Sequence, residues 1–287
     1  MTKNYITRFA PSPTGLMHIG HGFSALLAFE AAQKNNGKLL LRIEDIDQTR
    51  CRPEFVEAIY TDLSWLGISW AEPVRVQSEH FDDYENALKT LGDMGLLYPC
   101  FCTRAEIKKE LENAPSAPHG FDGVVYPETC KHMGASDQQH KKESGTPYAL
   151  RLDMAKALAM LKARLNWPLF WQDEVKGNVE ATPQDMGDII LARKETPTSY
   201  HLAVSIDDHL SGITHIIRGN DLFAATHIHC LLQALLGFKT PLYTHHKLLN
   251  DEDGNRLAKR TDAPSLKSLR ENGVDGLELA KKLTARA

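Results

Sequence analysis

Short apolar runs near the N-terminus alternate with polar turns and with one stretch of helical periodicity. Tyr5–Phe9 is a β-like run, and Ala10–Gly15 (Ala-Pro-Ser-Pro-Thr-Gly) continues neither a helix nor a central strand, because proline lacks a backbone N–H. A helix is expected next, since apolar residues recur at helical spacing at Phe23, Leu26, Leu27 and Ala31. Leu39–Ile43 has the pattern of a buried strand. Strand, turn, helix and strand form a βαβ unit, so this region predicts a parallel sheet.

The pattern changes near residue 97, after two further predicted helices at Glu54–Leu66 and Phe81–Met94. Residues 100–150 are rich in Pro, Gly, Cys, His and Lys. They contain one predicted helix, Thr103–Leu111, which the capping pair Thr103 and Glu106 opens. Strand-like segments follow at Ala149–Leu152 and Leu169–Gln172.

The alternation of strand and helix returns with Ile213–Arg218 and a helix over Ala224–Leu236. We therefore expect an α/β protein whose doubly wound parallel sheet is interrupted by an inserted α+β subdomain. The expected division is residues 1–96 for the first half of the core, 97–190 for the insertion, 191–240 for the second half, and 241–287 for a polar loop and a short helical C-terminal region.

Composition narrows the class of protein. With 287 residues, 42% hydrophobic and 24% charged, the chain has enough apolar surface for a core and is not disordered or fibrous. No apolar run is long enough to cross a membrane, and the first residues lack the apolar core of a signal peptide. We expect a cytoplasmic monomer. The net charge is −4, yet the last 32 residues hold eight Lys or Arg against four Asp or Glu. That excess fits either a solvated helical tail or a surface for a phosphate backbone.

Five cysteines, an odd number in a chain expected to be cytoplasmic, do not form a disulfide framework. Three of them fall within 31 residues, at Cys100, Cys102 and Cys130, which suggests structural zinc with four tetrahedral ligands. From spacing alone the fourth ligand is His132, His119 or Tyr126, and three free buried thiols are the simpler alternative. Cys51 and Cys230 are expected to be unpaired.

The strongest chemical motif is Arg8–His21, which ends in His18-Ile19-Gly20-His21. His18 and His21 are three residues apart and share one face of the first helical turn. A helix N-terminus attracts phosphates, two imidazoles can donate to a triphosphate, and Gly20 lets an adenine ring lie against the backbone. Two histidines at this spacing also occur on ordinary helix faces or as weak metal pairs, but the preceding strand and turn favour a nucleotide site.

These residues resemble the class I aminoacyl-tRNA synthetases, whose signature is His-Ile-Gly-His. Three segments are similar to the glutamyl branch, namely Arg8–Gly15, Arg42–Asp45 and Gly212–Gly219. The resemblance extends from residue 5 to about 265. It implies a Rossmann-type catalytic core, an inserted subdomain of the kind that faces a tRNA acceptor stem, and activation of L-glutamate by ATP.

Glutamate carries two carboxylates and one ammonium, so its pocket requires an arginine fork and an acid. Arg8, Glu44 and Arg218 each stand at the end of a predicted strand, where ligands bind in open α/β sheets. The glutamate-binding positions implied by the resemblance are Arg8, Phe9, Ala10, Pro11, Ser12, Glu44, Tyr200 and Arg218. Asp207, Asp208 and His209 lie near the pocket by the same resemblance, without an assigned role.

A second motif, Arg256-Leu257-Ala258-Lys259-Arg260, matches the family's lysine loop, which closes over ATP. Lys259 matches the lysine that stabilises phosphate charge, whereas Arg256 replaces the first lysine and Ala258 replaces a serine. On its own such a stretch is usually a basic surface turn. The resemblance implies catalysis by His18, His21, Lys259 and a Mg²⁺ ion bound with ATP, and ATP binding by His18, Gly20, His21, Arg256 and Lys259.

The resemblance also narrows the zinc site and the acceptor. Short glutamyl-type enzymes place a tyrosine four residues before the last cysteine, which implies Tyr126 as the fourth ligand of one Zn²⁺ per chain. Full glutamyl-tRNA synthetases carry a large anticodon-reading domain after the lysine loop, but Arg260 lies only 27 residues from the end of this chain. The sequence therefore resembles the truncated glutamyl-Q tRNA(Asp) synthetase family. That family activates glutamate without tRNA and transfers it to the queuosine base at the wobble position of tRNA(Asp).

Two alternatives to this function are a minimal glutamyl-tRNA synthetase that charges a 3′ end and a non-catalytic tRNA-binding paralogue. The sequence also departs from its relatives in one place. They usually read Thr-Pro-Arg-Gln where this chain has Thr226-His227-Ile228-His229, so an arginine that would face nucleic acid or ATP is missing.

Overall fold

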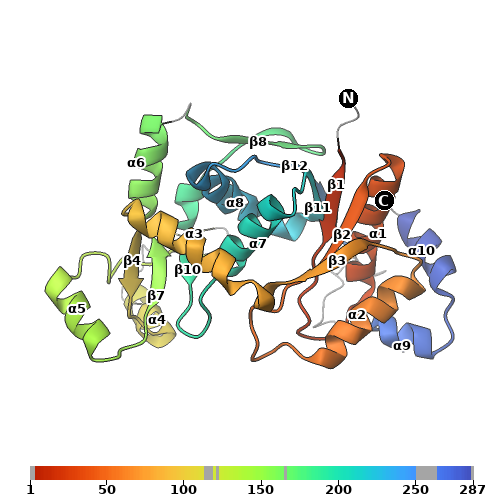
Figure 1. The fold of residues 1–287 in the computed structure, drawn as a ribbon, viewed down its shortest axis with the longest axis horizontal. Helices are drawn as coiled ribbons and strands as arrows, with labels where there is room; N and C mark the ends of the chain where they lie inside the picture. Colours follow the sequence, from red (N-terminus) through yellow and green to blue (C-terminus); the bar gives the residue numbers. More distant parts are fainter. Residues whose placement is uncertain (1–3, 113–118, 121–122, 165–166, 250–263, 286–287) are drawn as a thin grey trace.

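The N-terminal part forms three parallel strands covered by helices (Figure 1). In the computed structural model, which describes residues 4–112, 119–120, 123–164, 167–249 and 264–285, β1 (Ile6–Phe9) pairs with β2 (Lys38–Ile43) and β2 pairs with β3 (Ala71–Val76). The connections are α1 (Ile19–Lys34) and α2 (Pro53–Trp65). This is the βαβ unit that the sequence predicts.

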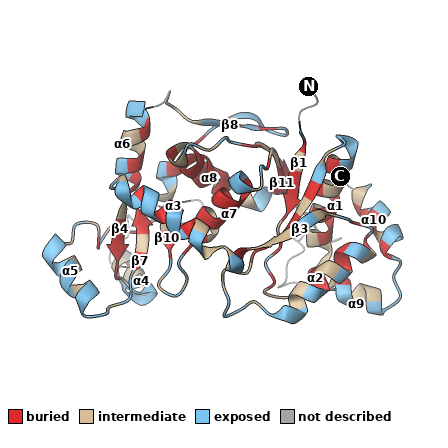
Figure 2. Cartoon of the chain, in the orientation of Figure 1, coloured by how far each residue is buried: buried red, intermediate tan, exposed pale blue. Residues whose placement is uncertain are grey.

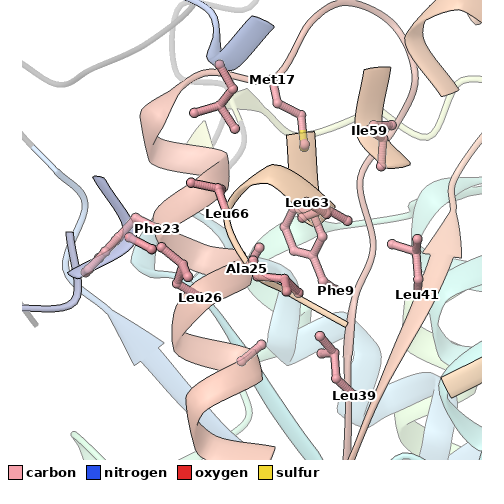
Figure 3. Close-up of a cluster of buried hydrophobic side chains, with 14 of the residues drawn as sticks. Phe9, Met17, Phe23, Ala25, Leu26, Leu39, Leu41, Ile59, Leu63 and Leu66 are labelled. Carbon is pink, nitrogen blue, oxygen red and sulfur yellow. The ribbon is translucent and has the colours of Figure 1, made fainter. Parts of the chain in front are cut away.

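Side chains from these elements form one core. Figure 3 shows this cluster, with Phe23, Ala25 and Leu26 from α1, Leu39 and Leu41 from β2, and Ile59 and Leu63 from α2; Phe23 lies at one side of it and Leu41 at the other. Helices α9 (Leu266–Glu271) and α10 (Gly276–Thr284) complete this core from the C-terminal side through Leu266, Ala280 and Leu283. The Leu266 N–H donates to the Met17 carbonyl at 2.8 Å, so the chain returns to the start of α1.

The second half contains a further parallel set. Strand β11 (His215–Gly219) pairs with β12 (Leu242–His246), and α8 (Phe223–Leu236) connects them. Strand β8 (Phe170–Asp173), inside the 97–190 range, pairs in parallel with β12 and antiparallel with β9 (Gly177–Glu180). Strands β1 and β11 are linked where the Thr214 N–H donates to the Ile6 carbonyl at 2.9 Å. The expected α/β fold with a parallel sheet is confirmed.

The middle of the chain adds a small sheet of order β10-β7-β4. Its strands, all antiparallel, are β4 (Leu97–Cys100), β7 (Ala149–Leu152) and β10 (Ile190–Ala192). The remaining described elements are α3 (Phe81–Asp93), α4 (Arg104–Glu112), α5 (Ala135–Glu143), α6 (Met154–Arg164), α7 (Tyr200–Leu210), the short pair β5 (His119–Gly120) and β6 (Gly123–Val124), and 3₁₀ turns at Gln77–Glu79, Pro183–Met186 and Asn220–Leu222.

Burial follows this arrangement (Figure 2). Helix α8 and strands β1, β2 and β11 are mostly buried, whereas α5 has no buried residue and lies at the edge of the molecule. Helix α7 lies between the two halves and buries seven consecutive residues, including Asp207 and Asp208. Within the described ranges, no helix is both long and apolar enough to cross a membrane.

Candidate active site

A cavity of about 380 Å³ opens where β1, β2 and β11 end and α1 begins. The structure brings together around it every expected glutamate- or ATP-binding residue that it describes: Arg8, Phe9, Ala10, Pro11, Ser12, His18, Gly20, His21, Glu44, Tyr200 and Arg218. The carboxyl ends of neighbouring parallel strands meet at one edge of a sheet, which is why residues some 200 positions apart converge here.

The start of α1 fixes both histidines of the His18–His21 motif. The His18 Nδ1 accepts from the Gly20 N–H at 3.0 Å, and the His21 Nδ1 accepts from the His18 N–H at 3.1 Å. This reciprocal cap satisfies N–H groups that the helix leaves unpaired. Because each Nδ1 is an acceptor, a neutral ring carries its hydrogen on Nε2. Two imidazole N–H groups and a helix N-terminus thus form a site suited to an anion.

Two residues that line the cavity, Arg8 and Glu44, belong to a buried ionic network with Arg42 and Asp208 behind them, and we call these four residues the acidic wall. Arg8 Nε lies 3.0 Å and Arg42 Nη1 2.7 Å from Asp208 Oδ1, and Arg42 Nη2 lies 3.0 Å from Glu44 Oε1. Burial opposes ionisation of Asp208, but Arg8 and Arg42 outweigh it and hold the pKa of this carboxyl below its usual value. At Glu44 burial prevails over Arg42 and Arg8, so its pKa is raised.

Asp207 and His209, which had no assigned role, belong to the packing of α7. Asp207 accepts from Arg75 Nε and Gln77 Nε2, each at 2.7 Å, and from the Tyr84 hydroxyl at 3.0 Å. His209 stacks on Phe238 with ring centroids 3.7 Å apart. Of the three residues, only Asp208 contacts an arginine that lines the cavity.

Arg218 also lines the cavity and is surrounded by neutral groups. We call Arg218, Thr226, His229 and His245 the imidazole wall. The Arg218 guanidinium donates to His245 Nε2 at 3.1 Å and to Thr226 Oγ1 at 2.6 Å, and its Nη1 lies 3.3 Å from His229 Nδ1. Burial and the charge of Arg218 lower the pKa of His245 to about 4 and that of His229 well below its usual value. Both rings are therefore neutral near pH 7. Within the described ranges, no carboxylate lies within ion-pair distance of Arg218.

The imidazole wall explains the departure at Thr226–His229. Thr226, His227, Ile228 and His229 are all buried on α8, and Ile228 is 0% exposed. The stretch that replaces the relatives' arginine therefore packs into the protein interior and contributes no charge to the surface. Thr226 and His229 contact Arg218, and the His227 Nδ1 accepts from the Thr182 N–H at 2.9 Å.

The lysine loop lies outside the described residues, and with it Arg256 and Lys259. The described residues on either side of it are at the cavity. Leu249 lines the cavity, and Ser265 forms a β-bridge with His18. Sequence reasoning missed a neighbouring pair, Ser24 and His246, which also line the cavity with Ser24 Oγ 2.9 Å from His246 Nε2.

Away from the cavity, Cys100, Cys102 and Cys130 form a cluster that can hold a metal ion, with sulfur atoms all within 4.8 Å of one another. The Tyr126 hydroxyl oxygen lies 3.3 Å from the Cys100 sulfur and 3.4 Å from the Cys102 sulfur. Burial raises the pKa of the Cys102 thiol to about 12, and a cation would offset that cost of ionisation. Three sulfurs and one oxygen at this spacing fit tetrahedral zinc.

The other two candidates for the fourth zinc ligand are His132 and His119. The His132 side chain is 80% exposed, with Nε2 3.9 Å from a Glu128 oxygen. The side chain of His119 lies outside the described part of the chain. Cys51 and Cys230 are free thiols, and Cys230 is buried in α8.

Comparison with known proteins agrees with this geometry. Residues 5–286 match the family described as tRNA synthetases class I (E and Q), catalytic domain. A glutamyl-Q tRNA(Asp) synthetase from Rhodobacter capsulatus is 43% identical, over 96% of this chain and 98% of that protein. A glutamate–tRNA ligase from Aquifex aeolicus is 37% identical over 93% of this chain, which spans only 54% of that ligase.

A solved structure shows the same fold. The glutamate tRNA ligase of Elizabethkingia meningosepticum, in complex with its amino acid, superposes with a TM-score of 0.74 and 26% identity, covering 94% of this chain and 53% of the ligase. The resemblance inferred from the sequence motifs is thereby confirmed. This chain belongs to the class I tRNA synthetases of the E and Q type, and within them it is similar to the glutamyl-Q tRNA(Asp) synthetases.

Proposed function

We propose that this protein activates L-glutamate with ATP, without tRNA, and transfers the glutamate to the queuosine base at the wobble position of tRNA(Asp). The observation that carries the proposal is one cavity lined both by a helix start suited to an anion and by a buried arginine that has no carboxylate partner among the described residues. The first feature suits the phosphates of ATP, and the second suits a substrate carboxylate.

In the activation step, a glutamate carboxylate oxygen attacks the α-phosphorus of ATP. A bond from that oxygen to the α-phosphorus forms, the bond from the α-phosphorus to the bridging oxygen breaks, and pyrophosphate leaves with the electron pair. No enzyme nucleophile takes part, so catalysis consists of positioning and of stabilising phosphate charge. A Mg²⁺ ion bound with ATP would supply further positive charge.

The described residues have distinct tasks in this reaction. Arg218 binds a substrate carboxylate, and Glu44 accepts from the ammonium through Oε2, since Arg42 bonds only Oε1. Arg8, held by Asp208, lines the same pocket with Phe9, Ala10, Pro11, Ser12 and Tyr200. His18 and His21 donate to the triphosphate from Nε2, and Gly20 lies under the adenine ring. We assign Lys259 and Arg256 to the phosphates by their place in the lysine loop.

The assignment of the acceptor rests on similarity. The R. capsulatus relative, named for glutamyl-Q tRNA(Asp), matches over nearly its whole length, whereas the glutamate–tRNA ligases match over about half of theirs. A minimal glutamate–tRNA ligase is the second candidate, because the A. aeolicus ligase is 37% identical across 93% of this chain. We also propose a structural Zn²⁺ held by Cys100, Cys102, Cys130 and Tyr126.

The acceptor is tested with labelled glutamate, ATP and two pools of tRNA(Asp), one with queuosine and one with unmodified guanosine, and with tRNA(Glu) in a parallel reaction. We expect label only on the queuosine pool, in the anticodon fragment released by nuclease. Label at the 3′ end of tRNA(Glu) instead would identify a glutamate–tRNA ligase. Absence of both label and glutamate-dependent exchange between ATP and pyrophosphate would indicate a non-catalytic paralogue.

The role of Lys259 is tested in the activation step. Lys259→Ala should lower the rate of glutamate-dependent exchange by about 10²-fold, the usual scale for loss of one charge-stabilising group. Lys267→Ala, which removes an exposed lysine paired with Glu271, is the matched control and should exchange normally. An unchanged rate in Lys259→Ala would refute the assigned role.

A further inference from the structure

We propose that Asp173, acting through His245, is the positioning residue for Arg218 in the substrate cavity. The inference rests on the proposed function, because it takes a carboxylate of the amino-acid substrate to be the partner of Arg218. Asp173 does not line the cavity and would not touch substrate. Its effect would pass through one imidazole ring.

Three adjacent parallel strands bring these residues into line. On β11 and β12, Arg218 lies opposite His245. Asp173, at the end of β8, lies opposite Tyr243 of β12. Asp173 Oδ2 is 2.5 Å from His245 Nδ1, and His245 Nε2 accepts from Arg218 Nε at 3.1 Å. The side chains of Asp173 and His245 are both fully buried, so water does not compete for these bonds.

The order of donors and acceptors fixes the tautomer of His245. Arginine has only donors, so His245 Nε2 must be unprotonated, and the ring hydrogen is on Nδ1, where it faces the Asp173 carboxylate. Asp173 Oδ1 is itself held by the backbone N–H groups of Val175 and Lys176, each at 2.9 Å. The carboxylate therefore has a fixed orientation and selects the tautomer that accepts from Arg218.

This arrangement orients Arg218 without cancelling its charge. A carboxylate in direct contact, as at Arg8, would compete with a substrate carboxylate for the same guanidinium. An imidazole acceptor holds Nε instead, while Thr226 and His229 contact the two terminal nitrogens. In a buried site an oriented and uncompensated cation attracts an anion strongly.

The test is Asp173→Asn, which changes charge and donor pattern but hardly the shape. The amide oxygen should remain with the Val175 and Lys176 N–H groups, so the new NH₂ faces His245 Nδ1. The ring hydrogen then moves to Nε2 and confronts an Arg218 N–H. In tRNA-free exchange we expect the KM for glutamate to rise about tenfold, the scale for losing one hydrogen bond to a charged group, with the KM for ATP unchanged.

The matched control is Glu174→Gln, the same change one residue further on. Glu174 is exposed and accepts from the Thr244 hydroxyl, so both KM values should stay as in the parent protein. An equal rise of both KM values in Asp173→Asn would indicate a general structural defect and would overturn the proposal.

A double-mutant cycle with Arg218→Lys separates this proposal from the proposed function. If Asp173 acts through Arg218, adding Asp173→Asn to Arg218→Lys should raise the KM for glutamate no further. Should Arg218→Lys raise this KM while Asp173→Asn leaves it unchanged, the positioning role fails and the function stands. Should Arg218→Lys have no effect, or the parent protein show no exchange, the assigned function fails as well.

The tautomer of His245 can also be determined by NMR in the parent protein, so this test does not depend on whether a variant folds. In ¹⁵N-histidine-labelled protein, long-range nitrogen–proton correlations distinguish the two neutral tautomers. We expect His245 to show a hydrogen on Nδ1 and to stay neutral at about pH 6, since burial and Arg218 lower its pKa to about 4. A hydrogen on Nε2 would contradict the proposal.

Discussion

Arg8 and Arg218 line the same cavity from two strand ends, yet their surroundings are opposite. Arg8 belongs to the acidic wall, where it shares Asp208 with Arg42. Arg218 belongs to the imidazole wall, where its described hydrogen-bond partners are neutral. The same side chain is thus neutralised by the protein in one place and left charged in the other. We infer that the acidic wall mainly stabilises the structure, apart from the substrate contacts proposed for Arg8 and Glu44, and that the imidazole wall mainly binds an anion.

The energetic consequences differ accordingly. A buried ion pair is costly to break, because the partner that remains is a charge without compensation in a medium of low dielectric constant. A buried arginine among neutral acceptors is already a charge without a counter-charge before substrate binds, and binding of a substrate carboxylate would supply that counter-charge. Changes in the acidic wall should therefore lower stability most, and changes at Arg218 should lower activity most.

The largest effect is expected from Asp208→Asn. Arg8 and Arg42 would lose their shared carboxylate, so the free energy of unfolding should fall by about 3–5 kcal/mol in urea titrations. Asp47→Asn, which breaks an ion pair to the exposed Arg50, should cost less than about 1 kcal/mol. Equal small losses in the two variants would show that the acidic wall does not stabilise the fold.

Arg218→Met should separate the two roles of the walls. Removal of the uncompensated cation should lower glutamate-dependent exchange by about 10²-fold or more. Its former partners are neutral, so the loss of stability should be about 1–3 kcal/mol, below that of Asp208→Asn. A variant that keeps its exchange rate but unfolds easily would reverse our assignment of the two walls.

The cysteine cluster shares no residue with either wall. Loss of its metal therefore shows how a change outside both walls affects the KM for glutamate. We expect about one zinc per chain in freshly purified protein and much less in Cys130→Ser, with full content in Cys230→Ser. The KM for glutamate of the zinc-poor protein should match that of the parent. Metal analysis that finds far less than one zinc in the parent protein would exclude the site.

The smallest expected effect is a dependence of the free energy of unfolding on pH. The two walls should lose their contributions to stability in different pH ranges. His201 adjoins the imidazole wall, with Nδ1 3.3 Å from His229 Nε2. Burial, together with Arg218, lowers the pKa of His201 and of His245 to about 4, whereas in the unfolded chain these rings titrate near 6.5. The unfolded state therefore binds more protons, and stability from the neutral rings is lost as pH falls from about 6.5 to about 4. The pKa of Asp208 is also lowered, so its contribution is lost only below the usual carboxyl range, under about pH 4.

Thermal unfolding between neutral and acidic pH measures this dependence. His201→Gln should flatten the slope in the upper part of the range, because one proton fewer is taken up on unfolding. A slope unchanged by this substitution would mean that His201 is not held neutral by burial. Both walls lie in one folded unit, so the two pH ranges can be compared in a single series.

The sequence predicted the parts of this site that lie on regular patterns. Periodicity identified α1 and β2, and the His18–His21 motif indicated a helix start, which the structure confirms. We expected a strand from Ile213, but it begins at His215. Ile213 is buried in a hydrophobic cluster without belonging to the strand, so its apolar side chain extended the predicted strand too far. Helix α7 was not predicted, since the burial of Asp207 and Asp208 on one helix runs against an amphipathic pattern.

The imidazole wall was beyond sequence reasoning for a different reason. Asp173 and His245 are 72 residues apart, and only the pairing of β8 with β12 brings them together. Neither residue stands in a recognisable motif. The one available signal was the unusual Thr226–His229 stretch, which the sequence marked only as the loss of an arginine and not as a set of buried partners for Arg218.

The most direct test of the account is exchange between labelled pyrophosphate and ATP, without tRNA, at increasing L-glutamate. With Arg218 assigned to the side-chain carboxylate, the group that glutamine lacks, we predict exchange that depends on L-glutamate, is not supported by L-glutamine, and is lost in Arg218→Met. Exchange that L-glutamine supports equally well, or that survives in Arg218→Met, would contradict the central claim that this cavity activates glutamate through an uncompensated arginine.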